Sequence, residues 1–337
     1  MRIYRSTKSS FNLYRVAFIS LLYLCCASHT KALNYYWVGN GGNWSNLSHW
    51  ATTSGGNTFH SQVPTAVDDV FFDANSFSGP SQVVYFDLDT AYAHHVNWTG
   101  VLFSPSCNGF YNRIMKIYGS LTLVPNMQIW KHTYFSATTA GQTITSAGHL
   151  FLNTTIFNGD GGEWTFQDAF SAQTISFEQG TIHTNDQTVN ASTFFSTSAL
   201  TRRLNMGASV FNLTGTNAML LQNSTNLTIN SGTSVLNCTA DGALLKSNSS
   251  GNYTFNDVNF TSTVKGTIAG SAHFHDVHFH GDGEISSSNS FHDLNFTAGH
   301  NYTISGYSEI TILGSLNATG TCTAMINISP EVGYLAS

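Results

Sequence analysis

The chain has 337 residues, and only 9% of them are Asp, Glu, Lys or Arg, whereas an ordinary soluble domain carries about 25%. Apolar residues make up 41% and aromatic residues 13%, so the chain can bury a large core, and the composition excludes both charge-driven disorder and a charge-laced coiled coil. The formal net charge is −6, and Asn, Ser, Thr and Gly supply most of the polar surface; these residues disfavour helix interiors. The composition indicates a β-rich extracellular protein.

Residues 1–32 have the pattern of a secretory signal peptide. Five basic residues and no acidic residue lie in this segment, and Val16–Cys26 is an apolar run. Thr30-Lys31-Ala32 provides small residues for cleavage before Leu33. A membrane span needs about 20 apolar residues, so a single-span anchor is a weaker alternative, as is a lipoprotein linked through Cys25 or Cys26.

Removal of residues 1–32 takes away five of the 12 basic residues and none of the 18 acidic ones, which leaves a net charge of −11. A surface of that charge repels nucleic acid and anionic lipid. We therefore expect a secreted or extracellular protein, with surface attachment as one option, that has no nucleic-acid partner and does not insert into a membrane once the signal is removed.

Residues 33–80 are predicted to form an N-terminal cap rich in Trp and Gly. The segment begins with WVGNGGNWSNLSHW (residues 37–50) and continues with VPTAVDDVFFDANSF (residues 63–77). Three Trp residues within fourteen positions need a shared packing site, and Pro64 followed by Asp68 and Asp69 marks a turn into a strand. A cap of this kind would cover the open apolar end of a repeat domain.

Residues 81–337 contain repeats that predict a right-handed parallel β-helix, an all-β fold. A six-residue pattern, Phe-x-Asp-Val/Leu-x-Phe, occurs at residues 255–260, 274–279 and 291–296, with spacings of 19 and 17 residues. GASVFNLT (residues 207–214) matches GTSVLNCT (residues 232–239) at an offset of 25. Such lengths suit one coil of a β-solenoid. An antiparallel sandwich or propeller is the alternative, but hairpin signals are few.

In this architecture equivalent residues of successive coils stack about 4.8 Å apart. Phe255, Phe274 and Phe291 are therefore predicted to form an internal aromatic ladder, and Asn212 is predicted to stack on Asn237. The chain ends at Ser337 within an expected coil, so a truncated repeat domain is one interpretation of its end.

The Trp/Gly segment and the stretches after it, such as GDGGEWTF (residues 159–166), resemble large secreted repeat proteins of Bacteroidetes. Proteins of that group are adhesin-like, are predicted to be β-helical, and are often exported by the type IX system. The resemblance covers most of the chain after the signal and implies a surface role. It carries no catalytic motif that transfers to residues of this sequence.

Four histidines are the candidate metal ligands: His275, His278, His280 and His292. His275 and His292 are predicted to share an outward column with Asn256, whereas His278 and His280 lie two apart on one strand face, about 6.5–7 Å from each other. Zn²⁺ or Cu²⁺ could accept these imidazoles, with Asp276 or Asp293 as an additional ligand. The alternative is a solvated surface column on which His simply replaces Asn.

Asp257, Asp276 and Asp293 form a predicted carboxylate column, which could bind a cation such as Ca²⁺. The favoured interpretation is an Asx-type turn, in which each Asp accepts hydrogen bonds from backbone N–H groups at a corner of the solenoid. A polysaccharide-active β-helix enzyme would need carboxylates about 5–10 Å apart. Its candidate fragments, which are Asp68-Asp69, Asn185-Asp186 and Arg113–Lys116, are not expected to converge.

We therefore expect a secreted or cell-surface β-solenoid with a structural or adhesive role, with glycans or surface proteins as partners and with no cofactor. A lyase or glycoside hydrolase is the alternative. The sequence leaves open the ligand, the route of attachment and the oligomeric state. The cysteines Cys107, Cys238 and Cys322 follow neither a disulfide framework nor a zinc motif, and one bridge between two of them stays open.

Overall fold

The computed structural model describes residues 31–109, 113–127, 130–131, 133–305 and 308–330. The chain divides into two units, Met1–Leu33 and Asn34–Ser337, and every described strand belongs to the second unit. The predicted signal peptide, residues 1–32, lies almost entirely outside the described residues. Within the described residues, no helix has the length and apolar character to cross a membrane.

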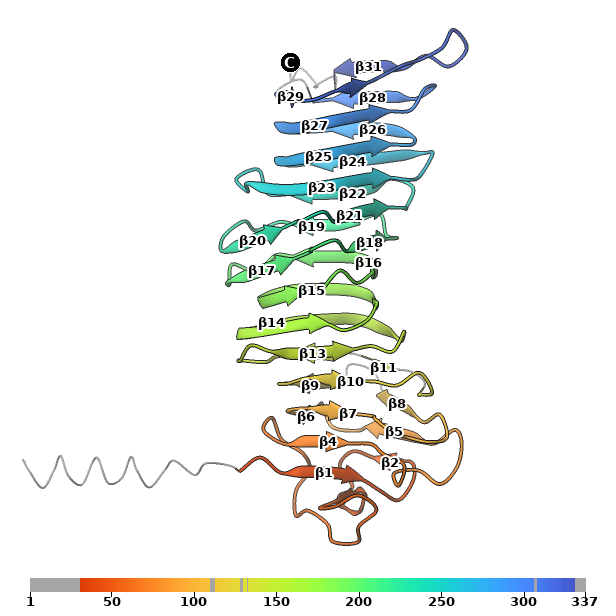
Figure 1. The fold of residues 1–337 in the computed structure, drawn as a ribbon, viewed down its shortest axis with the longest axis vertical. Helices are drawn as coiled ribbons and strands as arrows, with labels where there is room; N and C mark the ends of the chain where they lie inside the picture. Colours follow the sequence, from red (N-terminus) through yellow and green to blue (C-terminus); the bar gives the residue numbers. More distant parts are fainter. Residues whose placement is uncertain (1–30, 110–112, 128–129, 132, 306–307, 331–337) are drawn as a thin grey trace, which may run out of the picture. The chain divides into compact units, whose positions relative to one another are not determined.

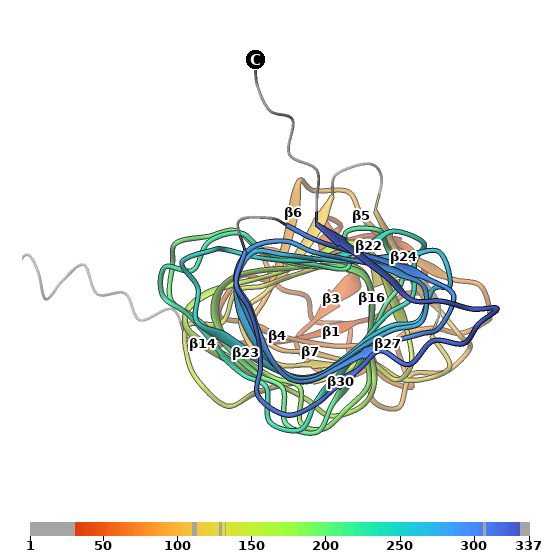
Figure 2. The same ribbon diagram turned by 90° about the horizontal axis from the view of Figure 1, so that it is seen from above.

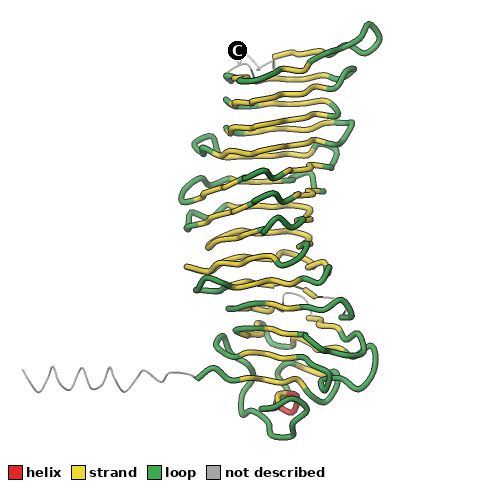
Figure 3. Tube along the Cα trace, in the orientation of Figure 1, coloured by secondary structure: helices red, strands yellow, loops and turns green. Residues whose placement is uncertain are grey.

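The second unit is a parallel β-solenoid of about 11 turns, which confirms the predicted all-β class. Figure 1 shows the coils stacked along the long axis, and Figure 3 shows that strands and connecting loops make up nearly all of each coil. The single described helix is one 3-10 turn, η1 (Leu47–His49). All pairings between described strands are parallel except that of β1 with β3 (Trp50–Ala51).

Each coil passes through three faces in chain order, and the view along the axis in Figure 2 shows the coils enclosing one central column. The first face holds β1 (Asn34–Trp37), β4 (Asp69–Phe71), β7 (Val96–Asn97), β10 (Leu121–Thr122), β13 (Gln142–Thr145), β17 (Arg202–Asn205), β20 (Leu227–Asn230) and β29 (Ile310–Ile312). The second face holds β2 (Gly42–Asn43), β5 (Val83–Phe86), β8 (Ser106–Gly109), β11 (Trp130–Lys131), β18 (Val210–Leu213), β21 (Val235–Cys238) and β30 (Leu316–Asn317).

The third face holds β6 (Thr90–Ala93), β9 (Ile114–Ile117), β12 (Thr133–Phe135), β19 (Met219–Leu221), β22 (Ala243–Ser247), β24 (Lys265–Ala269), β26 (Asp282–Ile285), β28 (Asn301–Ile304) and β31 (Asn327–Pro330). Six longer strands bend around corners and so belong to more than one face: β14 (Leu150–Phe166), β15 (Phe170–His183), β16 (Val189–Ser196), β23 (Tyr253–Phe260), β25 (Ala272–Phe279) and β27 (Asn289–Phe296).

The predicted repeats set the strand register. Phe255 pairs with Phe274, and Phe274 pairs with Phe291, so the spacings of 19 and 17 residues are the lengths of two successive coils. The three rings are buried and stacked, with centroid distances of 5.5 and 5.2 Å. Asn212 pairs with Asn237, as the offset of 25 predicts. The aromatic ladder and the asparagine stack are both confirmed.

A corner of the solenoid lies inside the Phe-x-Asp-Val-x-Phe pattern. Along β23 the apolar residues Phe255, Val258 and Phe260 are buried, while the consecutive Asn256 and Asp257 both face outward. Strict alternation would bury one of these two, so the strand must bend between them. In the pairing of β23 with β25, Phe255 and Asp257 have partners and Asn256 between them has none. Residues from Asp257 onward pair with β21 of the second face, so the bend lies between the first and second faces.

The N-terminal Trp residues share one packing site, as predicted. Trp37 and Trp44 each contact Trp50 edge-on, with centroids 4.9 and 4.6 Å apart, and all three side chains are buried. Trp37 also stacks on His49, and a Cβ at Gly42 would lie 2.1 Å from the ring of His49. Only glycine leaves space for that ring, which explains one glycine of the GNGGNW sequence.

The sheet runs without a break across residue 80. β4 pairs in parallel with β1 on one side and with β7 on the other, and Phe72 stacks on Trp98 at 3.8 Å. The aromatic cluster of residues 33–80 is therefore continuous with the core of the later coils.

The three cysteines after the signal segment are free thiols. Cys107 and Cys238 are buried and Cys322 is exposed. Burial raises the pKa of Cys238 to about 12 and raises that of Cys107 well above its ordinary value. These two thiols pack as small apolar side chains in the core.

Candidate functional site

A ladder of asparagine side chains runs along the outside of the second face. Asn212 donates from Nδ2 to Asn190 Oδ1 at 2.9 Å, Asn237 donates to Asn212 at 3.1 Å, and Asn259 donates to Asn237 at 3.1 Å. Each amide has two N–H donors and an oxygen with two lone pairs. The ladder uses one donor of each bonded amide, so further hydrogen-bonding capacity remains along a regular, half-buried row.

A second, shorter ladder lies on the first face. Asn230 donates from Nδ2 to Asn205 Oδ1 at 2.6 Å, and the amide of Asn205 lies 3.1 Å from Nδ1 of His183. His183 and Asn205 line an open hollow of about 220 Å³. Polar rows at the coil repeat therefore occur on two faces of the solenoid.

The histidines predicted as metal ligands form two separate groups. His275 and His292 stack with ring centroids 4.9 Å apart and with planes 4° from parallel, at the corner between the first and second faces. His278 and His280 stack on each other at 4.0 Å further along β25 and its following loop. The structure brings together the members of each pair, and only the first pair adjoins the aspartate column.

The aspartate column is in register, since Asp257 pairs with Asp276 and Asp276 with Asp293. Nδ1 of His275 lies 3.6 Å from Asp257 Oδ1 and 3.4 Å from Asp276 Oδ2. Nδ1 of His292 lies 3.1 Å from Asp293 Oδ2. We define these five side chains as the His/Asp corner.

The hydrogen bonds of the three carboxylates differ. Asp293 Oδ1 accepts from Ser315 N and Ser315 Oγ, each at 2.6 Å, and these bonds, helped by His292, hold the pKa of Asp293 at about 2. The Oδ1 atoms of Asp257 and Asp276 are buried and have no hydrogen-bond partner. The predicted Asx-type turn is therefore wrong for all three aspartates, because the corner is a bend within a paired strand. Asp257 Oδ1 and Asp276 Oδ1 accept no hydrogen bond, and the N–H that bonds Asp293 comes from Ser315 on the next coil and not from the same turn.

Burial raises the pKa of Asp276, and the neighbouring carboxylates of Asp257 and Asp293 add to this against the opposing effect of His275. Asp276 is flanked by a carboxylate on both neighbouring coils. Stacked carboxylates at the coil spacing repel each other, so the middle one is the most disfavoured as an anion.

His278 occupies the asparagine row, between Asn259 and Asn295. Burial, followed by the charge of His280, lowers the pKa of His278. In the unfolded chain His278 therefore binds a proton more readily than in the folded chain. The stability that comes from a neutral His278 is fully present above the ordinary pKa of about 6.5 and is lost as the pH falls below it.

We expect His278→Asn to reduce the loss of stability between pH 7.5 and pH 5.5, because the amide continues the row without a titrating group. Melting temperatures of both proteins at the two pH values test this. His280→Gln, which removes only the neighbouring charge, should give a smaller effect of the same sign. An unchanged pH dependence in His278→Asn would contradict the assignment.

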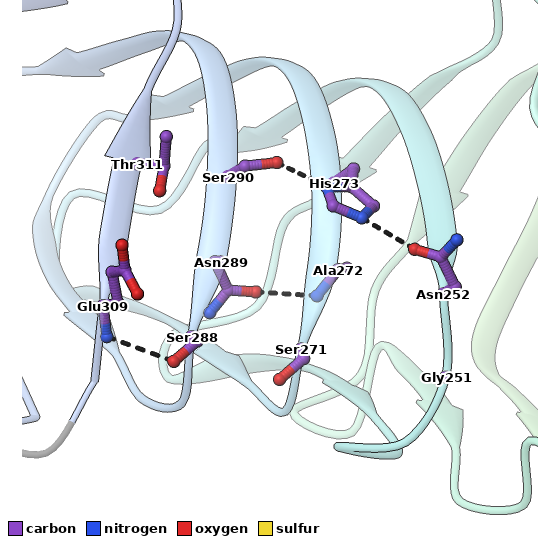
Figure 4. A pocket seen from close by; sticks show the side chains of 10 residues that line it. All are labelled: Gly251, Asn252, Ser271, Ala272, His273, Ser288, Asn289, Ser290, Glu309 and Thr311. Atoms are coloured by element: carbon purple, nitrogen blue, oxygen red, sulfur yellow. Dashed lines mark hydrogen bonds between the residues drawn. The ribbon is translucent and has the colours of Figure 1, made fainter.

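The described surface also carries open polar hollows. Figure 4 shows one of about 330 Å³ over β25, β27 and β29, where His273 Nε2 lies 2.7 Å from Asn252 Oδ1 and Asn289 Oδ1 accepts from the Ala272 N–H. Glu309 is the one acidic side chain among its lining residues, which include no Arg or Lys. Across this hollow and three others on the described residues, none is lined by more than two acidic side chains and none by Arg or Lys.

The fragments considered for an enzyme are used in structural contacts on separate coils. Asp68 accepts from Thr65, and Arg113 pairs with Asp89. Asp186 accepts from the Ala208 N–H at 2.6 Å. Their side chains do not meet in one groove, in agreement with the expectation from their spacing.

One cluster escaped the sequence reasoning. His94 Nδ1 lies 2.9 Å from Asp69 Oδ1, and the His95 backbone N–H donates to the same oxygen at 3.2 Å. His95 Nδ1 accepts from Ser120 N at 2.7 Å. Val70 pairs with Val96, so Asp69 and His95 lie on neighbouring coils 26 residues apart. The sequence did not reveal this spacing, because the early coils have no repeated motif. In this cluster both imidazole Nδ1 atoms and Asp69 Oδ1 have hydrogen-bond partners.

No protein-family model, no curated protein sequence and no solved structure matches this chain.

Proposed function

We propose that this protein is a secreted or cell-surface β-solenoid with a structural and adhesive role, and that it binds glycans along the asparagine ladder of its second face without transforming them. The signal-like segment at residues 1–32 and the resemblance to adhesin-like Bacteroidetes repeat proteins, with export by the type IX system, support secretion and surface display. The single observation that carries the binding role is the asparagine ladder from Asn190 to Asn259.

The ladder suits a repetitive polar ligand. Its amides recur once per coil, about 4.8 Å apart, and each is held by its neighbours, so little side-chain entropy is lost when a ligand binds. Sugar hydroxyls donate and accept hydrogen bonds, as amide groups do. The parallel pairing of the strands that carry the row keeps the spacing fixed. One of the four hollows is lined by two acidic side chains, Asp160 and Glu163, and a pair of carboxylates is the minimum that a glycoside hydrolase needs. None of the four is lined by Arg or Lys, so the enzyme stays the alternative that a degradation assay tests.

The test is a glycan array combined with a polysaccharide-degradation assay on the purified protein. We expect binding to one or more polysaccharides, weakened at least about tenfold, or 1.4 kcal/mol, in the double variant Asn212→Ala with Asn237→Ala. Asn230→Ala on the first face is the matched control and should bind as the wild type does. Absence of binding across the array would contradict the proposal, and release of shortened products would favour an enzyme instead.

A further inference from the structure

We propose that Asp257, His275 and Asp276 form a binding site for a first-row divalent transition ion such as Zn²⁺. The site lies at the corner between the first and second faces, where β23 and β25 bend. It is independent of glycan binding, because its side chains lie outside the asparagine row.

The distances at His275 suit a shared metal ion better than hydrogen bonds. Its Nδ1 lies 3.4 and 3.6 Å from two carboxylate oxygens, whereas N–H···O bonds are about 2.7–3.2 Å long. Zinc binds imidazole nitrogen and carboxylate oxygen at about 2.0–2.2 Å in a tetrahedron. Two such ligand atoms are then about 3.4 Å apart, which is close to both measured separations. The three side chains can each offer a ligand atom within 4.8 Å of the others.

One of the two carboxylate oxygens that face His275 has no hydrogen-bond partner. Asp257 Oδ1, one of the two oxygens that face His275, is buried and has no hydrogen bond, and Asp276 Oδ1 is in the same state. A buried carboxylate oxygen without a partner is costly, and a bound cation would satisfy it. The cation would also relieve the repulsion between the stacked carboxylates.

The next coil supplies an internal comparison. His292 and Asp293 are already joined at 3.1 Å, and Ser315 donates twice to Asp293. A Cβ at Gly314 would lie 2.7 Å from Asp293 Oδ1 and 2.8 Å from the ring of His292, so the following coil closes over this end of the column. The geometry therefore favours a metal ion at Asp257, His275 and Asp276. The ring of His292 stacks on that of His275 and holds its orientation.

The ligand set selects the ion. One imidazole and two carboxylates suit zinc and its neighbours in the first transition row, whereas Ca²⁺ and Mg²⁺ take oxygen ligands. The three protein ligands leave a fourth position to water. His275 is about half exposed, so we expect exchangeable binding and not a permanently held structural ion.

Titration of the purified, metal-free protein with ZnCl₂ by calorimetry tests the proposal, with CaCl₂ as a parallel arm. We expect one saturable zinc site per chain and no calcium binding at the same concentrations. His275→Gln and Asp276→Asn should each weaken zinc binding at least tenfold, and Co²⁺ should give the visible absorption of a four-coordinate ion in the wild type but not in these two variants. Zinc should also raise the melting temperature of the wild type and not that of His275→Gln.

His94→Gln is the matched control, because it alters a His/Asp cluster of similar spacing in which both Nδ1 atoms already have hydrogen-bond partners, and it should bind zinc as the wild type does. Asp257→Asn provides a third ligand variant should either of the others fail to fold, as judged by circular dichroism. No saturable zinc binding by the wild type would overturn the proposal. Binding that survives in all three ligand variants, or that is lost in His94→Gln, would overturn it equally.

Discussion

Replacement of Phe274 by Ala is expected to lower the free energy of unfolding by about 3–5 kcal/mol, the range for deleting a buried phenylalanine side chain. Phe274 is the middle ring of the aromatic ladder and is 3% exposed. Its ring stacks on Phe255 at 5.5 Å and on Phe291 at 5.2 Å. The neighbouring rings are fixed by backbone pairing on both sides, so they cannot collapse into the space that the ring leaves.

Urea denaturation followed by circular dichroism measures this effect. Stability in a solenoid is largely a sum of terms from each repeat and from its neighbours, so hydrogen exchange should show the loss concentrated in β23, β25 and β27. Tyr92→Ala is the matched control, since Tyr92 is 40% exposed, and it should change stability by no more than about 0.5 kcal/mol. A cost below about 1 kcal/mol for Phe274→Ala would contradict the ladder.

The sequence predicts the fold best where neighbouring coils carry similar residues. Stacking in register makes every coil face its equivalent, so the paired phenylalanines and asparagines repeat visibly at 17, 19 and 25 residues. Between residues 150 and 183 the signal is weaker. There β14 and β15 each bend through three faces with shifts in register, and core positions are filled by different apolar residues on successive coils.

The candidate site was predictable only in part. The repeats place His275 over His292 and stack the three aspartates, because these residues hold equivalent positions in the motif. The direction of each carboxylate was not predictable, since it depends on whether the next coil supplies a donor. Ser315 does so for Asp293, whereas Asp257 and Asp276 have no donor for Oδ1. Residue pattern alone therefore offers no reason to distinguish the two ends of the column.

The sequence analysis missed the buried Arg202. Arginine is ordinarily a surface residue, and the adjacent Arg203 is indeed exposed. Strand alternation with the buried Leu204 and Met206 places Arg202 on the inward side, but the sequence does not show which oxygens bond the guanidinium there. In the structure Arg202 is 1% exposed, and burial lowers its pKa from the ordinary value.

The buried guanidinium of Arg202 is held by oxygens of two coils. Its Nε donates to Leu200 O at 3.0 Å and its Nη1 to Ser196 Oγ at 2.6 Å, while Nη2 donates to Asn223 O and Thr225 O on the next coil. Ser196 Oγ in turn donates to Phe177 O on the preceding coil at 2.7 Å. The network therefore ties together three successive coils through one side chain.

Arg202→Ala is expected to cost at least about 3 kcal/mol in the free energy of unfolding, because several buried acceptors lose their donor at once and each costs about 1–3 kcal/mol. Arg202→Lys should recover only part of this, since an ammonium cannot reproduce the planar fork that reaches both coils. Urea denaturation with hydrogen exchange at residues 196–202 and 223–225 measures the loss. Arg203→Ala, on the outward side of the same strand, should be nearly neutral; an equal cost for the two alanine variants would show that the network does not stabilise the stack.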